Sequence, residues 1–249
     1  MKYKSYSKTI WDKIHQTLDH VLKSDPNPIA AFDADGTLWD TDLGESFFRY
    51  KIDRKLVKLP ADPWQHYVEL KKKNNDPREA YLWLAQICQG QKIEIVREWA
   101  KKSFDSIQPV PVFEDQKKLI QLFQGRGVQV FIVTASIKWA VEPGAEALGL
   151  SKDQVIGIET LVDHGLVTAK QHGVISYREG KVQALLEKTG KKLPFFSSGN
   201  TEGDLALLES ATQLRLVVGA AARDQELFRT ENKMQQIAEE KNWMKHRFV

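Results

Sequence analysis

A short apolar run that ends in acidic residues constrains this chain more than any other feature. Residues 28–32 read Pro-Ile-Ala-Ala-Phe, a pattern typical of a buried strand; Asp33 follows directly and Asp35 two residues later. Carboxylates at the end of a buried strand lose their hydration and repel one another. A divalent cation is the simplest group that would compensate for both effects, whereas an Asx-type turn would leave the burial uncompensated.

Further strand-like runs alternate with helix-like segments along the chain. The runs lie at residues 128–133, 155–161, 195–198 and 214–218, and helical patterns lie at residues 112–123, 180–188 and 202–209. Gly125 is expected just beyond the first of these helices, as its C′ residue. Short buried strands separated by helices indicate a parallel sheet with helices on both faces. The predicted fold class is therefore α/β, with a Rossmann-like core.

Residues 43–108 interrupt this alternation and contain helical patterns only. Two Asp-Pro pairs look like N-caps followed by proline at the first helical position, and the second adds a capping box: Asp62-Pro63 and Asp76-Pro77-Arg78-Glu79. We expect an all-helical cap over residues 43–108, inserted after the first strand of a core formed by residues 1–42 and 109–249. Its aromatic residues recur at helical spacing, which favours a role in the core of the cap: Trp64, Tyr67, Tyr81, Trp83 and Trp99.

Composition excludes several classes of protein. With 42% hydrophobic and 28% charged residues, the chain is expected to fold as an ordered globular protein. The formal net charge of +3 is too small to indicate a nucleic-acid partner. The single cysteine, Cys88, allows no intramolecular disulfide. No run approaches the roughly 18 apolar residues of a membrane span, and the N-terminus lacks the apolar core of a signal peptide. We therefore expect a cytoplasmic protein without a membrane partner; the oligomeric state is not indicated.

Small polar or acidic residues follow three of the predicted strands. In an open parallel sheet, ligands bind beyond the carboxyl ends of the strands. A lysine, Lys181, also opens the helix that precedes the third of these strands. The presence of small polar or acidic residues after all three strands is hard to explain by a contribution to stability alone. The residues that follow the three strands are Asp33, Asp35, Gly36 and Thr37; Thr134, Ala135 and Ser136; and Gly199, Asn200, Thr201 and Asp204.

These residues resemble the four motifs of the haloacid dehalogenase superfamily of phosphatases. DADGT at residues 33–37 is similar to the first motif, Thr134 to the second, Lys181 to the third, and GNTEGD at residues 199–204 to the fourth. Taken singly, Thr134 would be ordinary strand-end capping and Lys181 a surface lysine; their shared order over residues 29–204 favours the family. The helical insertion is similar to the small cap of the phosphoserine phosphatase-like branch.

The resemblance implies hydrolysis of a small-molecule phosphate ester. Asp33 would be the nucleophile and form an aspartyl-phosphate, and Asp35 would protonate the leaving alcohol and then activate water. Thr134, Ala135 and Lys181 would bind the phosphoryl group. The dehalogenase branch is disfavoured because Asp35 is present, whereas a halide leaves without a proton.

The resemblance also implies a Mg²⁺ site. Its ligands would be the carboxylate of Asp33, the backbone carbonyl of Asp35 and the side chain of Asn200. Gly36 would permit the close turn after the strand. Asp204 would hold the water shell of the metal or orient Lys181.

Asn200 departs from the fourth motif, which normally begins with aspartate. An amide oxygen can bind Mg²⁺ but removes one negative charge, so we expect weaker metal binding, and Asn200→Asp is expected to tighten it. Glu202 would compensate or would lie on the surface of the first helical turn. Two alternatives remain: a catalytically weak protein that binds a phosphorylated ligand or a partner protein, and a phosphotransferase. The first is disfavoured because the chain retains four motif residues: Asp33, Asp35, Thr134 and Lys181.

Asp42 gives an indication of the chemical class of the substrate. It lies seven positions after Asp35, where phosphoserine phosphatases carry a glutamate that pairs with the substrate amine, and Glu45 follows one turn later. An acidic entry would suit a small amine-bearing substrate such as phosphoserine, phosphoethanolamine or phosphocholine. Equally, Asp42 would serve only as the N-cap of the first cap helix. The second motif, TAS, differs from the SGG typical of phosphoserine phosphatases, which counts against phosphoserine itself.

Overall fold

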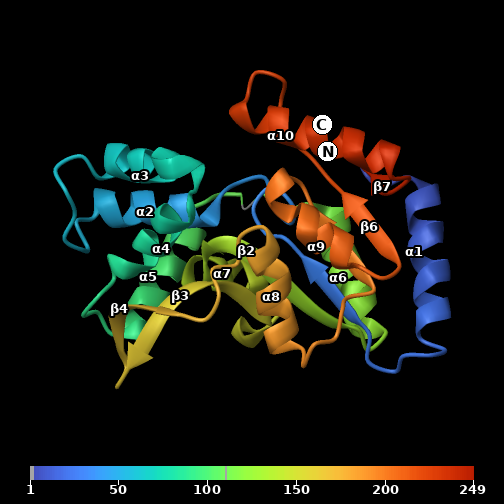
Figure 1. Cartoon of the computed structure of the whole chain (residues 1–249), viewed down its shortest axis with the longest axis horizontal. Helices are drawn as coiled ribbons and strands as arrows, with labels where there is room; N and C mark the ends of the chain where they lie inside the picture. The colour runs from blue at the N-terminus through green and yellow to red at the C-terminus, as the bar shows by residue number, and fades with distance from the viewer. Residues whose placement is uncertain (1–2, 110) are drawn as a thin grey trace.

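A mostly parallel sheet forms the centre of the computed structural model, which describes residues 3–109 and 111–249 (Figure 1). Within these residues the sheet has seven strands, in the order β4-β3-β2-β1-β5-β6-β7. β4 pairs antiparallel with β3, and the other neighbours pair in parallel. The strands are β1 (Ile29–Phe32), β2 (Gln129–Ile137), β3 (Val155–Asp163), β4 (Leu166–His172), β5 (Phe196–Gly199), β6 (Leu214–Val217) and β7 (Met244–Lys245).

Helices cover both faces of the sheet. Alternate strand residues point to opposite sides, so Phe32 packs with α1, α6 and α7, whereas Ala31 packs with α8 and α9. The predicted α/β fold with helices on both faces is thereby confirmed. These helices are α1 (Lys8–Val21), α6 (Glu114–Gly125), α7 (Lys138–Ala147), α8 (Glu179–Lys188), α9 (Leu205–Ser210) and α10 (Glu226–Glu240); the short helical turns are η1 (Lys73–Asn75), η2 (Lys152–Gln154) and η3 (Glu202–Asp204).

The segment after β1 contains helices and no strand between residues 43 and 108: α2 (Leu43–Asp53), α3 (Pro63–Lys72), α4 (Arg78–Gln86) and α5 (Ile93–Asp105). Its apolar cluster is not self-contained, because Tyr67 and Leu84 share it with Trp139 of α7 and Val167 of β4. The helices therefore lie at the β4 end of the sheet (Figure 1). The division into a cap and a core at residues 42/43 and 108/109 stays a prediction; residues 1, 2 and 110 of the predicted core lie outside the described residues.

Two predicted helix ends are wrong. Gly125 is the last residue of α6, and the left-handed residue that follows the helix is Gly127, with a φ of 78°. The capping box at Asp76–Glu79 does not form. Asp76 Oδ1 instead accepts the N–H of Arg78 at 3.1 Å, and Glu79 pairs with Lys73 at 2.7 Å. The N-cap at Asp62 is confirmed, because its Oδ1 accepts the N–H of Gln65 at 3.0 Å.

The C-terminal segment packs on the core. Met234 and Ala238 of α10 are fully buried against Leu208 of α9 and Val217 of β6. The chain then returns to the sheet, where β7 pairs with β6. No helix in the described part of the chain is both long enough and apolar enough to cross a membrane.

Candidate active site

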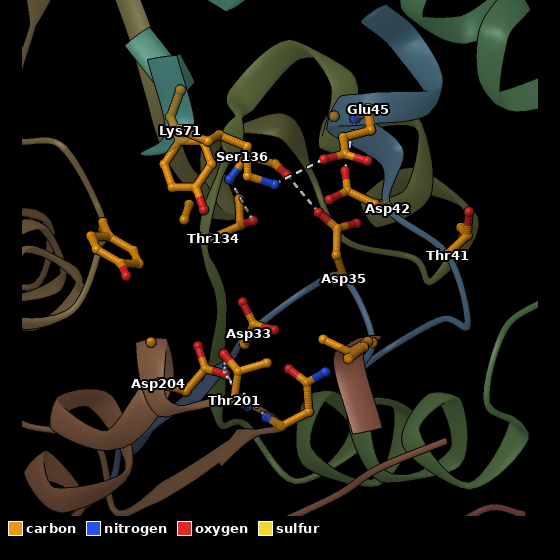
Figure 2. A pocket seen from close by; sticks show the side chains of 18 of the residues that line it. Asp33, Asp35, Thr41, Asp42, Glu45, Lys71, Thr134, Ser136, Thr201 and Asp204 are labelled. Carbon is orange, nitrogen blue, oxygen red and sulfur yellow. Dashed lines mark hydrogen bonds and ion pairs between the residues drawn. The ribbon is translucent and has the colours of Figure 1, made fainter. Parts of the chain in front are cut away.

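The carboxyl ends of β1, β2 and β5 meet at one pocket of about 540 Å³. Because parallel strands end at the same edge of the sheet, residues far apart in the chain converge there. Figure 2 shows Asp33, Asp35, Thr134 and Asp204 around the same space. Every residue predicted for the site lines this pocket: Asp33, Asp35, Gly36, Asp42, Thr134, Ala135, Lys181, Asn200 and Asp204.

Asp33 lies at the base of the pocket and is 6% exposed. Its Oδ1 accepts a hydrogen bond from Lys181 Nζ at 2.6 Å, and its Oδ2 accepts one from the Thr37 hydroxyl at 2.9 Å. Burial and the charge of Asp204 raise the pKa of Asp33 to about 7, against the opposing charge of Lys181. A second cation beside this carboxylate would favour its ionised form.

Lys181 joins two carboxylates. Its Nζ lies 2.6 Å from Oδ1 of Asp33 and 2.6 Å from Oδ1 of Asp204. Burial alone would lower the pKa of Lys181, but the two carboxylates outweigh it and raise that pKa. The other oxygen of Asp204 accepts the N–H groups of Asn200 at 3.1 Å and Thr201 at 2.9 Å. Asp204 therefore holds the loop after β5 and orients Lys181.

Asp35 is held by three donors. Its Oδ1 accepts from Trp39 Nε1 at 2.7 Å and from the N–H of Leu43 at 2.9 Å. Its Oδ2 accepts from the Ser136 hydroxyl at 2.5 Å (Figure 2). Burial raises the pKa of Asp35, although these hydrogen bonds oppose the change. Sequence reasoning assigned no such role to Trp39 or Ser136. The only signal for Ser136 is its place in the polar run that follows the strand predicted at residues 128–133.

Thr134 is 1% exposed and points into the pocket near the C-terminal end of β2. The register between β2 and β3 shifts between Val133 and Ile137, so β2 bulges there. Thr134 Oγ1 accepts the N–H of Ser136 at 3.0 Å, which fixes the bulged segment. Thr134 and Ala135 thus line the pocket through an irregular stretch rather than a regular strand end.

Asn200 is buried directly behind Gly36. A Cβ added to Gly36 would lie 2.1 Å from Asn200 Nδ2, and the φ of Gly36 is 75°, so only glycine fits this turn. The amide of Asn200 has one partner on each side. Oδ1 lies 3.3 Å from the Thr37 hydroxyl, and Nδ2 donates to Glu231 Oε1 at 3.4 Å. No motif marked Glu231. Glu202 pairs instead with Lys233 on the surface.

Oxygen donors for a cation gather beside Asp33. The Thr37 hydroxyl lies within hydrogen-bond distance of both Asp33 Oδ2 and Asn200 Oδ1. These two oxygens therefore lie close to each other, beside that hydroxyl. Among the described residues, no group of three His, Cys, Asp or Glu side chains could hold a metal by itself. These two oxygens belong to a carboxylate and an amide, which are hard donors of the kind that fits Mg²⁺.

Residues of α2, α3 and α4 line a further part of the pocket. Asp42 Oδ1 accepts the N–H of Glu45 at 2.7 Å and so caps α2, while the same side chain lines the pocket. Glu45 Oε1 in turn accepts from Lys71 Nζ at 3.1 Å and from the Tyr67 hydroxyl at 3.3 Å. Tyr67 and Tyr81, predicted as core residues, also line the pocket. This part of the pocket therefore combines two acids, one base and aromatic rings.

Known families and structures resemble this chain over most of its length. A family model described as haloacid dehalogenase-like hydrolase matches residues 30–209. No curated protein matches the chain. A functionally unknown protein from Anaerococcus prevotii DSM 20548 has a TM-score of 0.74 at 15% identity, covering 100% of this chain and 97% of that chain.

Phosphoserine phosphatases are also among the similar structures. A substrate-bound phosphoserine phosphatase complex has a TM-score of 0.51 at 17% identity, with 78% of this chain and 87% of that chain covered. A phospho-aspartyl intermediate analogue of phosphoserine phosphatase has a TM-score of 0.50 at 18% identity, with 77% of this chain and 86% of that chain covered. At such identities the likeness shows a shared fold.

The family match spans all four motifs, from the strand before Asp33 to Asp204, and covers well over half of the chain. The family predicted from the sequence is thus confirmed. The chain belongs to the haloacid dehalogenase-like hydrolase family.

Proposed function

We propose that this protein is a Mg²⁺-dependent phosphatase that hydrolyses a small phosphomonoester through an aspartyl-phosphate on Asp33. The observation that carries the proposal is that Lys181 contacts the buried Asp33 carboxylate while Asp35 lines the same pocket. The arrangement supplies a nucleophile, a cation to balance charge and a separate acid.

Asp33 would attack the phosphorus atom with a carboxylate oxygen, and the bond to the leaving alcohol oxygen would break. The reaction needs charge neutralisation, because the phosphoryl oxygens repel an incoming anion. Lys181 would supply one positive charge beside Asp33, and the Thr134 hydroxyl and the main chain at Ala135 would contact the phosphoryl oxygens. Mg²⁺ bound by Asp33, the Asp35 carbonyl and Asn200 would neutralise further charge and align the phosphoryl group.

Asp35 would act as the general acid and then as the general base. Its raised pKa favours the protonated form, from which it would give a proton to the departing alkoxide. The resulting carboxylate would take a proton from the water that attacks the phosphorus, which restores Asp33 and releases phosphate. Trp39, Leu43 and Ser136 fix the position of this carboxyl group.

The substrate we propose is small and bears an amine. Asp42 and Glu45 line the pocket beyond Asp35, where the leaving group would lie. Glu45 is already paired with Lys71, so Asp42 is the better partner for a cation. The pocket of about 540 Å³ suits a metabolite better than a protein.

A panel of small phosphomonoesters tests the reaction. Phosphate release would be measured with Mg²⁺ and with a chelator, in the presence and absence of added alcohols. Metal-dependent release of inorganic phosphate supports the hydrolase. Transfer of the phosphoryl group to an added alcohol would indicate a phosphotransferase. No release from any ester, with folded protein and saturating Mg²⁺, would favour a protein that only binds a phosphorylated ligand.

A further inference from the structure

We propose that Glu231 is a positioning residue that holds the Asn200 amide with its oxygen toward the metal site, and that Asn200 and Glu231 form a matched pair. The inference rests on the proposed function, because it assigns Asn200 to the metal. It gives the C-terminal helix α10 a part in building the site. It also explains why the fourth motif of this chain begins with an amide.

Glu231 lies in α10 and is completely buried, with 0% exposure. A buried carboxylate needs hydrogen-bond donors, and the loop after β6 provides them. Glu231 Oε2 accepts the N–H of Ala221 at 3.0 Å, and Oε1 lies 3.3 Å from the N–H of Ala220. Arg247 Nη1 lies 3.5 Å from Oε2. The position of this carboxylate is therefore fixed by groups other than Asn200.

The space around Glu231 is also closely fitted. A Cβ on Gly219 would lie 2.8 Å from Glu231 Oε2, so a larger residue in this loop would displace the carboxylate. Gly219 follows β6, and Asn200 follows β5, which is the neighbouring strand in the sheet. α10 thus inserts an acidic side chain between the ends of two strands, behind the pocket rather than in it.

A fixed carboxylate determines which end of the Asn200 amide faces it. Only Nδ2 can donate a hydrogen bond, and it donates to Glu231 Oε1 at 3.4 Å. Oδ1 must then point the opposite way, toward the Thr37 hydroxyl and the carboxylate of Asp33. That is the direction in which a metal ligand needs its oxygen. An aspartate at position 200 would instead face Glu231 with no donor, and two buried carboxylates would repel each other.

The negative charge that an aspartate would carry at position 200 is therefore supplied by Glu231, which contacts Asn200 rather than the metal. Groups that hydrogen-bond to a ligand orient it and increase its basicity, and their removal commonly weakens metal binding about 10–100-fold. Glu231 makes such a hydrogen bond to the Asn200 amide. The change from aspartate to asparagine is then a rearrangement of charge rather than a sign of lost activity.

Mg²⁺ titration by calorimetry tests the pair directly and needs no turnover. Glu231→Gln keeps the size of the side chain but removes its charge, and we expect its Mg²⁺ dissociation constant to rise about 10-fold or more. Glu202→Gln is the matched control, because it neutralises an acid that pairs with Lys233 on the surface. Its dissociation constant should equal that of the parent chain.

Thermal melting without metal tests the pairing independently. Asn200→Asp alone should lower the melting temperature, because it places two carboxylates face to face. The double variant Asn200→Asp/Glu231→Gln should recover most of that loss, because the glutamine amide can donate to the new carboxylate. It should also bind Mg²⁺ more tightly than Glu231→Gln alone.

The outcomes separate the two proposals. A parent chain that binds no Mg²⁺ would overturn the metal in the proposed function and this inference with it. Mg²⁺ bound equally well by the parent and Glu231→Gln would overturn the inference alone. So would a double variant that melts no higher than Asn200→Asp.

Discussion

Asp35 and Ser136 lie 101 residues apart in the chain, and the Ser136 hydroxyl donates to Asp35 Oδ2 at 2.5 Å. This contact joins the loop after β1 to the irregular end of β2. Together with Trp39 and the N–H of Leu43, it holds the Asp35 carboxyl group in place at the pocket. The position of Asp35 is thus determined by tertiary contacts, which agrees with a role in proton transfer.

Asp35→Asn should affect substrates according to their leaving groups. An alkyl phosphate needs a proton on its leaving oxygen, so its turnover should fall about 10²–10⁴-fold. p-Nitrophenolate leaves without a proton, so the first step with p-nitrophenyl phosphate should remain fast while dephosphorylation slows. Rapid mixing should then show a burst of about one p-nitrophenol per enzyme molecule. Equal slowing of both substrates without a burst would contradict the assignment.

Asp42→Asn separates the two roles open to this residue. Asparagine is as good an N-cap as aspartate, so α2 should keep its stability. The loss of charge should raise the KM for amine-bearing phosphomonoesters about 10-fold, which corresponds to about 1.4 kcal/mol of binding. The KM for p-nitrophenyl phosphate, which has no amine, should change much less. Similar changes for both substrates would show that Asp42 serves only as a cap.

Lys51 is a buried cation outside the pocket, with 0% exposure. Its Nζ donates to the Leu84 carbonyl at 3.0 Å and lies 3.5 Å from Cys88 Sγ. No carboxylate is paired with it in the described part of the chain. Lys51→Met keeps the apolar stem without the charge and should stabilise the protein by about 1 kcal/mol or more. Lys51→Ala, which also leaves a cavity, should be less stable than Lys51→Met by about 2 kcal/mol in urea unfolding.

The stability of the parent protein should depend on pH because of the buried Lys51. Burial lowers the pKa of Lys51 in the folded state from its ordinary value of 10.5. The folded protein therefore releases this proton at a pH where the unfolded chain still holds it. The stability of the parent rises with pH across that interval. The advantage of Lys51→Met over the parent should shrink as the pH is raised toward 10.5. A constant difference would show that Lys51 stays charged.

Gly36→Ala should disrupt the site by sterics alone. The added Cβ would lie 2.1 Å from Asn200 Nδ2, and the φ of 75° is strained for alanine. The strain should cost about 1–3 kcal/mol, and the displacement of Asn200 should weaken Mg²⁺ binding. Gly90→Ala is a matched control, because Gly90 also has a positive φ but no atom within 4 Å of an added Cβ. A melting temperature lowered equally in both variants would contradict the steric account.

The sequence predicts the base of the pocket well because the pocket depends on strand ends. β1 was expected at residues 29–32 and begins and ends there. Once the sheet is parallel, the C-terminal ends of β1, β2 and β5 must share one edge. Asp33, Thr134 and Asn200 therefore meet without any further information about side chains.

Local signals failed where tertiary packing decides. α7 runs through Pro143 and Gly144, although proline and glycine by themselves disfavour a helix interior. Gly144 leaves room for Trp39, whose ring would lie 2.7 Å from a Cβ at that position. Glu231 could not be found from a motif, because its connection to Asn200 exists only after α10 has packed across β6.

The measurement that tests the central claim most directly compares the parent chain with Asp33→Asn. Phosphate release from p-nitrophenyl phosphate would be measured with saturating Mg²⁺. Asp163→Asn, at the exposed end of β3, would serve as a control. If Asp33 forms the aspartyl-phosphate, metal-dependent release should fall by at least about 10³-fold in Asp33→Asn, because an amide is a poor nucleophile. The control should retain the parent rate. Turnover by a folded Asp33→Asn protein at the rate of the parent would contradict the proposed mechanism.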